Sequence, residues 1–274
     1  MHTVGCPEMP IANVNGINID YKDEGHGEPL IMISGAGADK SAWRSQTKEF
    51  KKHYRTITFD NRGVGKSDKP AGPYSIRMMA DDTVGLMDHL GIEKAHVLGV
   101  SAGGIIAQEL AISYPERVNK LILASTFAPK EETGGWSSEF TEAISTYVRS
   151  SHDEASRRRL TDVIMDLQIN KWSYRTFILP LIKIAIRLMP FGAGVDAQFE
   201  AVGTCVTADR LGMIKASTLV MTGTDDRLIR PVSSEVIASL IPKAKLVKVL
   251  GGGHSFPMEM SGEFIKEVLN FLRS

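Results

Sequence analysis

Short apolar runs alternate with helix-like patterns along most of the 274-residue chain. Apolar runs bounded by turn signals predict buried strands, whereas apolar residues spaced three and four apart predict amphipathic helices. We expect strands at 11–14, 17–21, 29–33, 55–59, 95–99, 118–124, 217–222 and 245–249, and helices at 75–90, 102–114, 231–241 and 262–272. This alternation favours a parallel sheet that is covered by helices on both faces.

The chain opens on a hairpin and later carries a long insertion. Asn15-Gly16 separates the first two strand-like runs and is typical of a tight hairpin turn. Between residues 129 and 212 the pattern is helical with almost no strand signal. We therefore predict an α/β fold with a mostly parallel eight-stranded sheet, helices on both faces and a helical cap inserted after the sixth strand. The predicted core domain comprises residues 1–128 and 213–274, and the predicted cap comprises residues 129–212.

The composition is that of an ordinary globular protein. Hydrophobic residues make up 43% of the chain, and 32 basic residues balance 32 acidic ones, so no net field would attract nucleic acid or an anionic membrane. No secretion signal or membrane span is recognisable, and Cys6 and Cys205 are too few for a disulfide framework. We expect a cytoplasmic protein that acts on a small-molecule substrate, with a homodimer as a possible assembly.

The segment with the most chemical information is Gly99-Val100-Ser101-Ala102-Gly103, which a predicted strand precedes and a predicted helix follows. A serine hydroxyl attacks a carbonyl only where a base can take its proton and N–H groups can meet the developing oxyanion. A sharp turn from strand to helix provides that exposure, and glycines at 99 and 103 let the two elements approach closely. Alone the pattern fits an ordinary glycine turn, but its flanking elements favour Ser101 as a nucleophile.

A histidine and two aspartates stand where a base and its orienting acid are needed. His254 follows the last predicted strand and three glycines, and Asp225 and Asp226 follow the strand at 217–222. Because the carboxyl ends of parallel strands meet at one edge of a sheet, we expect Ser101, His254 and one aspartate to converge. Spacing alone does not separate Asp225 from Asp226, since either could cap the following turn.

In these residues the chain resembles the α/β-hydrolase family, and is similar to its capped members among the enol-lactonases, cofactor-free haloperoxidases and small carboxylesterases. Residues 60–67 match the family's D-x-R-G-x-G-x-S loop, and residues 34–37 occupy the place of its oxyanion loop. The resemblance implies that Asp226 is the acid and that residues 60–67 are mainly structural. It also implies an oxyanion hole made by the backbone N–H groups of Ala36 and Ala102. Ser34 stands where many relatives have histidine, which leaves these backbone donors intact.

The expected function is that of a serine hydrolase. Ser101 would attack an ester, lactone or thioester of a small to medium, largely apolar substrate, with His254 as base and an acyl-enzyme as intermediate. Trp136 and Trp172 of the predicted cap are expected to line the substrate pocket. No cofactor is expected, and no metal, because no H-E-x-x-H or C-x-x-C spacing occurs. Two alternatives remain: a perhydrolase or haloperoxidase-like activity of the same residues with hydrogen peroxide, and a ligand-binding protein with little turnover.

Overall fold

The protein is built on an eight-stranded sheet. The computed structural model describes residues 10–128, 136–150, 153–170, 176 and 192–274. Its strands are β1 (Ile11–Val14), β2 (Ile17–Glu24), β3 (Pro29–Ile33), β4 (Arg55–Phe59), β5 (Ala95–Val100), β6 (Val118–Ala124), β7 (Ser217–Gly223) and β8 (Ala244–Val249). They are ordered β1-β2-β4-β3-β5-β6-β7-β8, and only the β1–β2 and β2–β4 pairs are antiparallel. The predicted mostly parallel sheet is confirmed.

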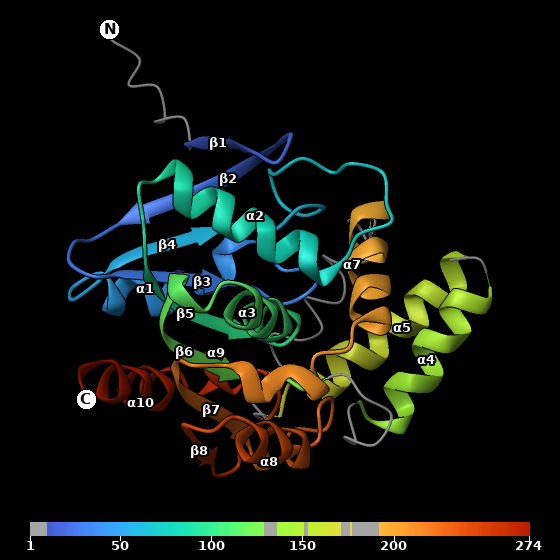
Figure 1. Ribbon diagram of the computed structural model, residues 1–274. Coiled ribbons are helices and arrows are strands. Elements are labelled where there is room, and N and C mark those ends of the chain that lie inside the picture. Colours follow the sequence, from blue (N-terminus) through green and yellow to red (C-terminus); the bar gives the residue numbers. More distant parts are fainter. Residues whose placement is uncertain (1–9, 129–135, 151–152, 171–175, 177–191) are drawn as a thin grey trace, which may run out of the picture.

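Helices cover both faces of this sheet (Figure 1). They are α1 (Arg44–Phe50), α2 (Ile76–His89), α3 (Ala102–Ser113), α4 (Ser138–Arg149), α5 (Glu154–Gln168), α7 (Ala193–Thr204), α8 (Pro231–Leu240), α9 (Phe256–Glu259) and α10 (Ser261–Arg273). Short 3-10 helices occupy η1 (Lys40–Trp43), η2 (Pro115–Arg117) and η5 (Ala208–Met213). No helix in the described part of the chain is long and apolar enough to cross a membrane.

The central strands are apolar on both sides because two separate cores lie against them. In β3, Ile31 and Ile33 belong to a core that includes residues of α2 and α3. The alternate residues Leu30 and Met32 belong to a second core with residues of α1 and α10. Since side chains alternate across a strand, such continuous apolar runs are expected only where both faces are covered.

The first turn of the chain has the predicted geometry. Asn15 and Gly16 link β1 to β2 with φ angles of 51° and 77°. Both angles lie in the left-handed region, which the two central residues of a type I′ turn adopt and which asparagine and glycine tolerate best. The predicted hairpin is therefore present, and β1 is placed at the edge of the sheet.

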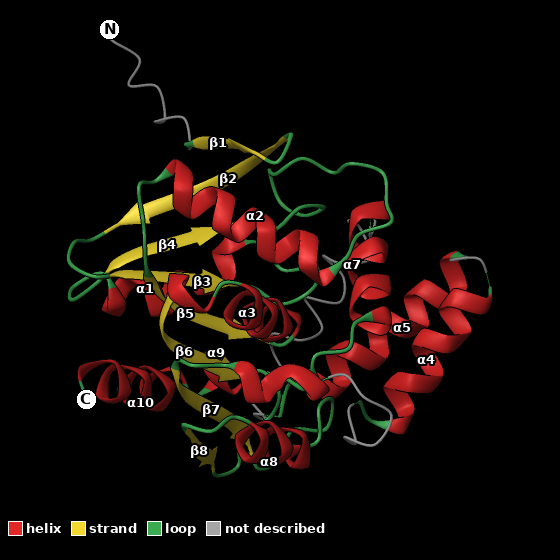
Figure 2. Ribbon diagram, in the orientation of Figure 1, coloured by secondary structure: helices red, strands yellow, loops and turns green. Residues whose placement is uncertain are grey.

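Three described helices, α4, α5 and α7, are inserted between β6 and β7. They lie beside the edge of the sheet toward which the parallel strands point (Figures 1 and 2). The helical insertion after the sixth strand is thus present, next to the edge where ligands of such sheets bind.

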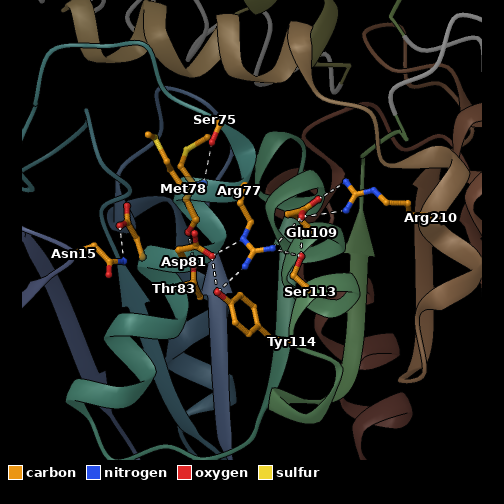
Figure 3. Close-up of polar contacts among 12 residues, drawn as sticks. Asn15, Ser75, Arg77, Met78, Asp81, Thr83, Glu109, Ser113, Tyr114 and Arg210 are labelled. Carbon is orange, nitrogen blue, oxygen red and sulfur yellow. Dashed lines mark hydrogen bonds and ion pairs between the residues drawn. The ribbon is translucent and has the colours of Figure 1, made fainter.

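A polar network joins η5, which leads from the insertion to β7, to the core helices α2 and α3 (Figure 3). The Arg77 guanidinium of α2 donates to Asp81 at 2.7 Å and to Tyr114 at 2.9 Å. On α3, Glu109 is buried and pairs with Arg210 of η5 at 2.6 Å. Burial alone would raise the pKa of Glu109, but the hydrogen bonds from Arg210 and Ser113 lower it below its ordinary value. The carboxylate therefore stays charged and holds η5 on α3 before the chain enters β7.

Candidate active site

Ser101 occupies the turn between β5 and α3, in the conformation that its sequence context predicts. Its φ of 56° lies in the left-handed region, which is costly for a residue with a side chain and marks a backbone held by its surroundings. A Cβ built on Gly99 would lie 2.3 Å from the Gly103 carbonyl oxygen, and one on Gly103 would lie 2.2 Å from that of Ile33. The close approach predicted at Gly99 and Gly103 is therefore real, and no larger residue fits at either position.

His254 lies in the loop between β8 and α9, with its side chain buried. Its Nδ1 is 2.9 Å from Asp226 Oδ2. The Ser125 hydroxyl donates to the His254 carbonyl oxygen at 2.8 Å, and the N–H of the next residue, Ser255, donates to the Gln168 carbonyl oxygen of α5 at 2.9 Å. The Asp226 carboxylate thus orients the imidazole, while the backbone at residues 254 and 255 is held by the residue after β6 and by α5 of the insertion.

Of the two aspartates after β7, Asp226 is the one that contacts the imidazole. Its Oδ1 accepts hydrogen bonds from the backbone N–H groups of Leu228 and Ile229 at 2.9 and 2.8 Å, which leaves Oδ2 for His254. Asp225 is exposed, and its carboxylate accepts from the Thr224 hydroxyl at 2.9 Å. The two adjacent carboxylates therefore have different partners, and only the Asp226 carboxylate is fixed behind the histidine.

Ser101 and His254 line one cavity of about 640 Å³. Its wall is mainly apolar and draws on the core and on the insertion, through Trp43, Val100, Phe127, Trp136, Phe140, Ile164, Val195 and Phe199. Among the described residues, no hydrogen bond joins the Ser101 hydroxyl to His254. Hydrogen bonds of this kind are often long without substrate and tighten in the complex, so the shared cavity is the relevant observation.

The loop after β3 lies directly against Ser101. A Cβ on Gly35 would lie 3.2 Å from Ser101 Cβ and 3.6 Å from its Oγ, so glycine lets the loop approach the hydroxyl. Ala36, the next residue, lines the same cavity, and so does Ala102 at the first position of α3. The first N–H groups of a helix have no partner inside the helix, so the Ala102 N–H is available to a ligand. The two expected oxyanion donors are therefore on the same cavity as the serine.

A buried ion cluster at the end of this loop helps to hold it in place, and this cluster was not predicted from the sequence. Lys40 of η1 contacts Asp20 and Asp60, and its Nζ is 2.9 Å from Asp60 Oδ2. The same carboxylate accepts the backbone N–H groups of Lys40 and Lys66, both at 2.8 Å. Burial alone would lower the pKa of Lys40, but hydrogen bonds to Asp20 and Asp60 raise it. Asp60 thus joins the start of the 60–67 loop to the end of the loop that carries Ala36.

The insertion supplies aromatic residues to the cavity. Of the two tryptophans expected at the substrate pocket, Trp136 lines this cavity, whereas Trp172 lies outside the described residues. Trp136 packs edge-on against Phe140 with ring centroids 4.8 Å apart, and Phe199 of α7 also contributes to the wall. Phe140 and Phe199 were not predicted, although the apolar spacing of Val195, Phe199 and Val202 on α7 would have indicated a face turned to the site. In the described part of the chain, no group of three metal-ligating side chains is present.

Comparison with known proteins agrees with this architecture. The model of the α/β hydrolase fold family matches residues 28–260. The chain belongs to the α/β-hydrolase family. A 2-hydroxymuconate semialdehyde hydrolase from a Pseudomonas species is 31% identical to this α/β hydrolase over 267 residues, which are 94% of this chain and 91% of that protein.

Solved structures of other enzymes superpose over nearly the whole chain. The enol-lactonase from Burkholderia xenovorans has a TM-score of 0.84 at 26% identity, covering 97% of this chain and all of that one. A thermophilic esterase from Thermogutta terrifontis has a TM-score of 0.81 at 26% identity, covering 97% of this chain and 98% of that one. The resemblance expected from the sequence motifs is confirmed at the level of fold and family.

Proposed function

We propose that this α/β hydrolase is a serine hydrolase that cleaves a carboxylic ester, lactone or thioester through an acyl-enzyme. The observation that carries the proposal is that the Asp226–His254 pair stands at the same cavity as a serine held at positive φ. A serine needs a base to become a nucleophile, and the base needs a group that fixes its orientation. The apolar cavity wall supports a largely apolar, small to medium substrate. The names of the similar enol-lactonase and esterase support the same class of bond.

In the proposed reaction, Ser101 Oγ attacks the carbonyl carbon while His254 takes the hydroxyl proton and Asp226 stabilises the imidazolium. The negative charge that develops on the carbonyl oxygen lies between the N–H groups of Ala36 and Ala102. The carbon–oxygen or carbon–sulfur bond then breaks, and the leaving group takes the proton from His254. Water repeats the sequence on the acyl-serine, and the carboxylic acid is released.

We also propose that residues 129–212 form a cap over this site and that residues 1–128 and 213–274 form the hydrolase core. Contacts of the insertion, at the end of α5 and just after it, with the loops that carry His254 and Asp226 support the cap position. Besides the bond from Ser255 to Gln168, Asn170 donates from its side chain to the Asp225 carbonyl oxygen at 2.7 Å. A cytoplasmic location and a homodimer stay predictions from the sequence.

The discriminating experiment compares wild type with Ser101→Ala on p-nitrophenyl acetate and butyrate. Loss of the nucleophile is expected to lower kcat by about 10⁴- to 10⁶-fold. Ser113→Ala, at the far end of the same helix and in the remote polar network, is the matched control and should keep full activity. Equal rates for wild type and Ser101→Ala would overturn the proposal. Substrate binding without Ser101-dependent turnover would overturn it in favour of a ligand-binding protein.

A further inference from the structure

Gln198 of α7 links the insertion to the loop that carries Ala36. Its side chain is buried, with 2% exposed, and both ends of its amide are used. Oε1 accepts the backbone N–H of Gly37 at 2.9 Å, and Nε2 donates to the Arg62 carbonyl oxygen at 2.7 Å. One side chain from the insertion therefore bridges two loops of the core, those that follow β3 and β4.

The bond to Gly37 adds a partner from the insertion to a tight turn, which the Ala38 N–H closes by donating to the Gly35 carbonyl oxygen at 3.2 Å. Gly37 has a φ of 73°, and it is flanked by two more small residues, Ala36 and Ala38. Glycine loses more conformational freedom on ordering than any other residue, so a second hydrogen bond, from outside the turn, restricts the conformations of this loop further. Because the peptide bond is planar, fixing the Gly37 N–H also fixes the carbonyl of Ala36, and this peptide plane is joined at the Ala36 Cα to the one that carries the Ala36 N–H.

Gln198 is held in turn by the seating of α7. A Cβ on Gly194 would lie 2.4 Å from the Gly63 carbonyl oxygen, so the first turn of α7 rests directly on the backbone of the loop after β4. Arg62, which accepts the Nε2 bond, immediately precedes Gly63 and forms a buried ion pair with Asp82 of α2 at 2.5 Å. The amide of Gln198 is therefore anchored to a rigid part of the core at one end and reaches the glycine loop at the other.

Two faces of α7 have different contacts. Val195, Phe199 and Val202 line the active-site cavity, whereas the amide of Gln198 points to the loop backbone and is satisfied there. A substrate in the cavity would contact the first three residues. Gln198 does not line the cavity, so it can affect the reaction only through the backbone that its amide holds, at Gly37 and at Arg62.

We propose that Gln198 is a positioning residue that aims the Ala36 N–H at the oxyanion, so that the seating of the insertion completes the oxyanion hole. The inference rests on the proposed function and adds a residue to it. Its physical basis is that a donor stabilises the transition state only when it is fixed at hydrogen-bond distance from the developing charge. Without the bridge, the loop would sample other conformations, and the donor would be misplaced while the cavity walls remained.

The experiment uses Gln198→Met, which keeps the length of the side chain and removes both hydrogen bonds. With p-nitrophenyl butyrate we expect kcat to fall by about tenfold to a hundredfold, with KM within about twofold of wild type, because ground-state contacts are unchanged. Affinity for a trifluoromethyl ketone, which forms a tetrahedral adduct with the serine, should fall with kcat/KM. A change confined to KM would overturn the inference, as would a kcat within twofold of wild type.

Gln108 offers a matched control. It is also fully buried and doubly bonded, donating to the Phe127 carbonyl oxygen at 3.0 Å and accepting from the Thr207 hydroxyl at 2.7 Å. Gln108→Met should lower the melting temperature as much as Gln198→Met and leave kcat close to wild type. An equal loss of kcat in both variants would mean that a general loss of stability is responsible, and would overturn the inference.

Gln198→Glu adds a readout that a merely structural role would not move. When protonated, the introduced carboxyl can accept from Gly37 and donate to the Arg62 carbonyl oxygen, as the amide does; when ionised, it repels that oxygen. The ratio of variant kcat to wild-type kcat should therefore rise as pH falls from 8 to 6, and a pH-independent ratio would overturn the inference. If wild type itself shows no Ser101-dependent turnover, the proposed function and this inference both fail. Turnover that is insensitive to Gln198 overturns the inference alone.

Discussion

Two buried histidines of this chain differ in what surrounds them. The imidazole of His254 has a buried carboxylate, that of Asp226, at one nitrogen and the cavity beside it. His96, inside β5, has its Nε2 3.2 Å from the exposed Glu28, and its Nδ1 is buried without a partner among the described residues. Burial therefore lowers the pKa of His96, against the weaker opposing effect of Glu28. His96 is a packing residue of the sheet. Protonation of its buried ring is therefore expected to lower the stability of the fold rather than to affect catalysis.

This difference predicts a pH dependence of stability that belongs to His96. In the unfolded chain imidazole binds a proton below about pH 6.5, while the folded state resists protonation of His96. Its contribution to stability is thus complete above that pH and is lost as pH falls, with a limiting slope of about 1.4 kcal/mol per pH unit. We expect the melting temperature of wild type to fall more steeply from pH 7.5 to 5 than that of His96→Gln. Parallel curves would show that His96 does not titrate differently on unfolding.

At the scale of elements, α7 shows that the position of a glycine decides whether a helix can dock closely on the backbone of a neighbouring loop. Gly194 allows backbone contact with Gly63, whose φ of 90° also favours glycine. Gly203, near the other end of the same helix, would accept a Cβ with no atom within 4 Å. The first glycine is needed for docking, and the second only lowers the helix propensity.

The two glycines of α7 therefore predict opposite effects of one substitution. Gly194→Ala should destabilise the protein by about 1–3 kcal/mol through overpacking against Gly63, and should increase amide hydrogen exchange along α7. Gly203→Ala should stabilise it by about 0.5–1 kcal/mol, as expected for alanine in an exposed helix position. Chemical denaturation and hydrogen exchange provide the two measurements. A neutral or stabilising Gly194→Ala would contradict the proposed backbone seating.

At the scale of the whole molecule, two neighbouring cavities meet at one aromatic wall. The cavity of Ser101 is lined by the core and the insertion, and the other is lined by residues of the insertion. The second, of about 520 Å³, lies between α4 and α7, and it shares Trp136 and Phe199 with the cavity of Ser101. Trp136 is also tied to the core, because it forms a bridge with Ile229 and the next N–H donates to the Leu228 carbonyl oxygen at 3.0 Å. The aromatic wall between the cavities is therefore fixed to the same loop that holds Asp226.

This arrangement predicts that Trp136 limits the length of the acyl chain. Trp136→Ala should connect the two cavities, and the ratio of kcat/KM for p-nitrophenyl decanoate over butyrate should rise about tenfold or more. Burial of two further methylenes at about 0.8 kcal/mol each is enough for that change. Ile144→Ala, which enlarges the second cavity without opening the wall, should leave the ratio unchanged. An unaltered ratio in Trp136→Ala would show that the wall does not limit the substrate.

The local patterns of the sequence were sufficient for the fold. Each central strand is a short apolar run, α2 and α10 are amphipathic, and α3 is apolar along nearly its whole length. These signals arise within a few residues of one another. The turn at Ser101 was predictable for the same reason, since strand, glycines and helix are contiguous. The chain order of serine, acid and histidine placed all three candidates at the carboxyl edge of the sheet, although their catalytic roles stay predictions.

Contacts between distant segments were decided only by the tertiary structure. Asp225 and Asp226 are neighbours in the chain, and the conformation of the loop after β7 decides that Asp226, not Asp225, contacts His254. Lys40 and Gln198 carry no local signal, because their partners, Asp60 and Gly37, lie on other elements. Side-chain periodicity tells which face of a helix is buried but not what it is buried against. The composition and order of the elements therefore follow from the sequence, and the coupling of the insertion to the site follows from their packing.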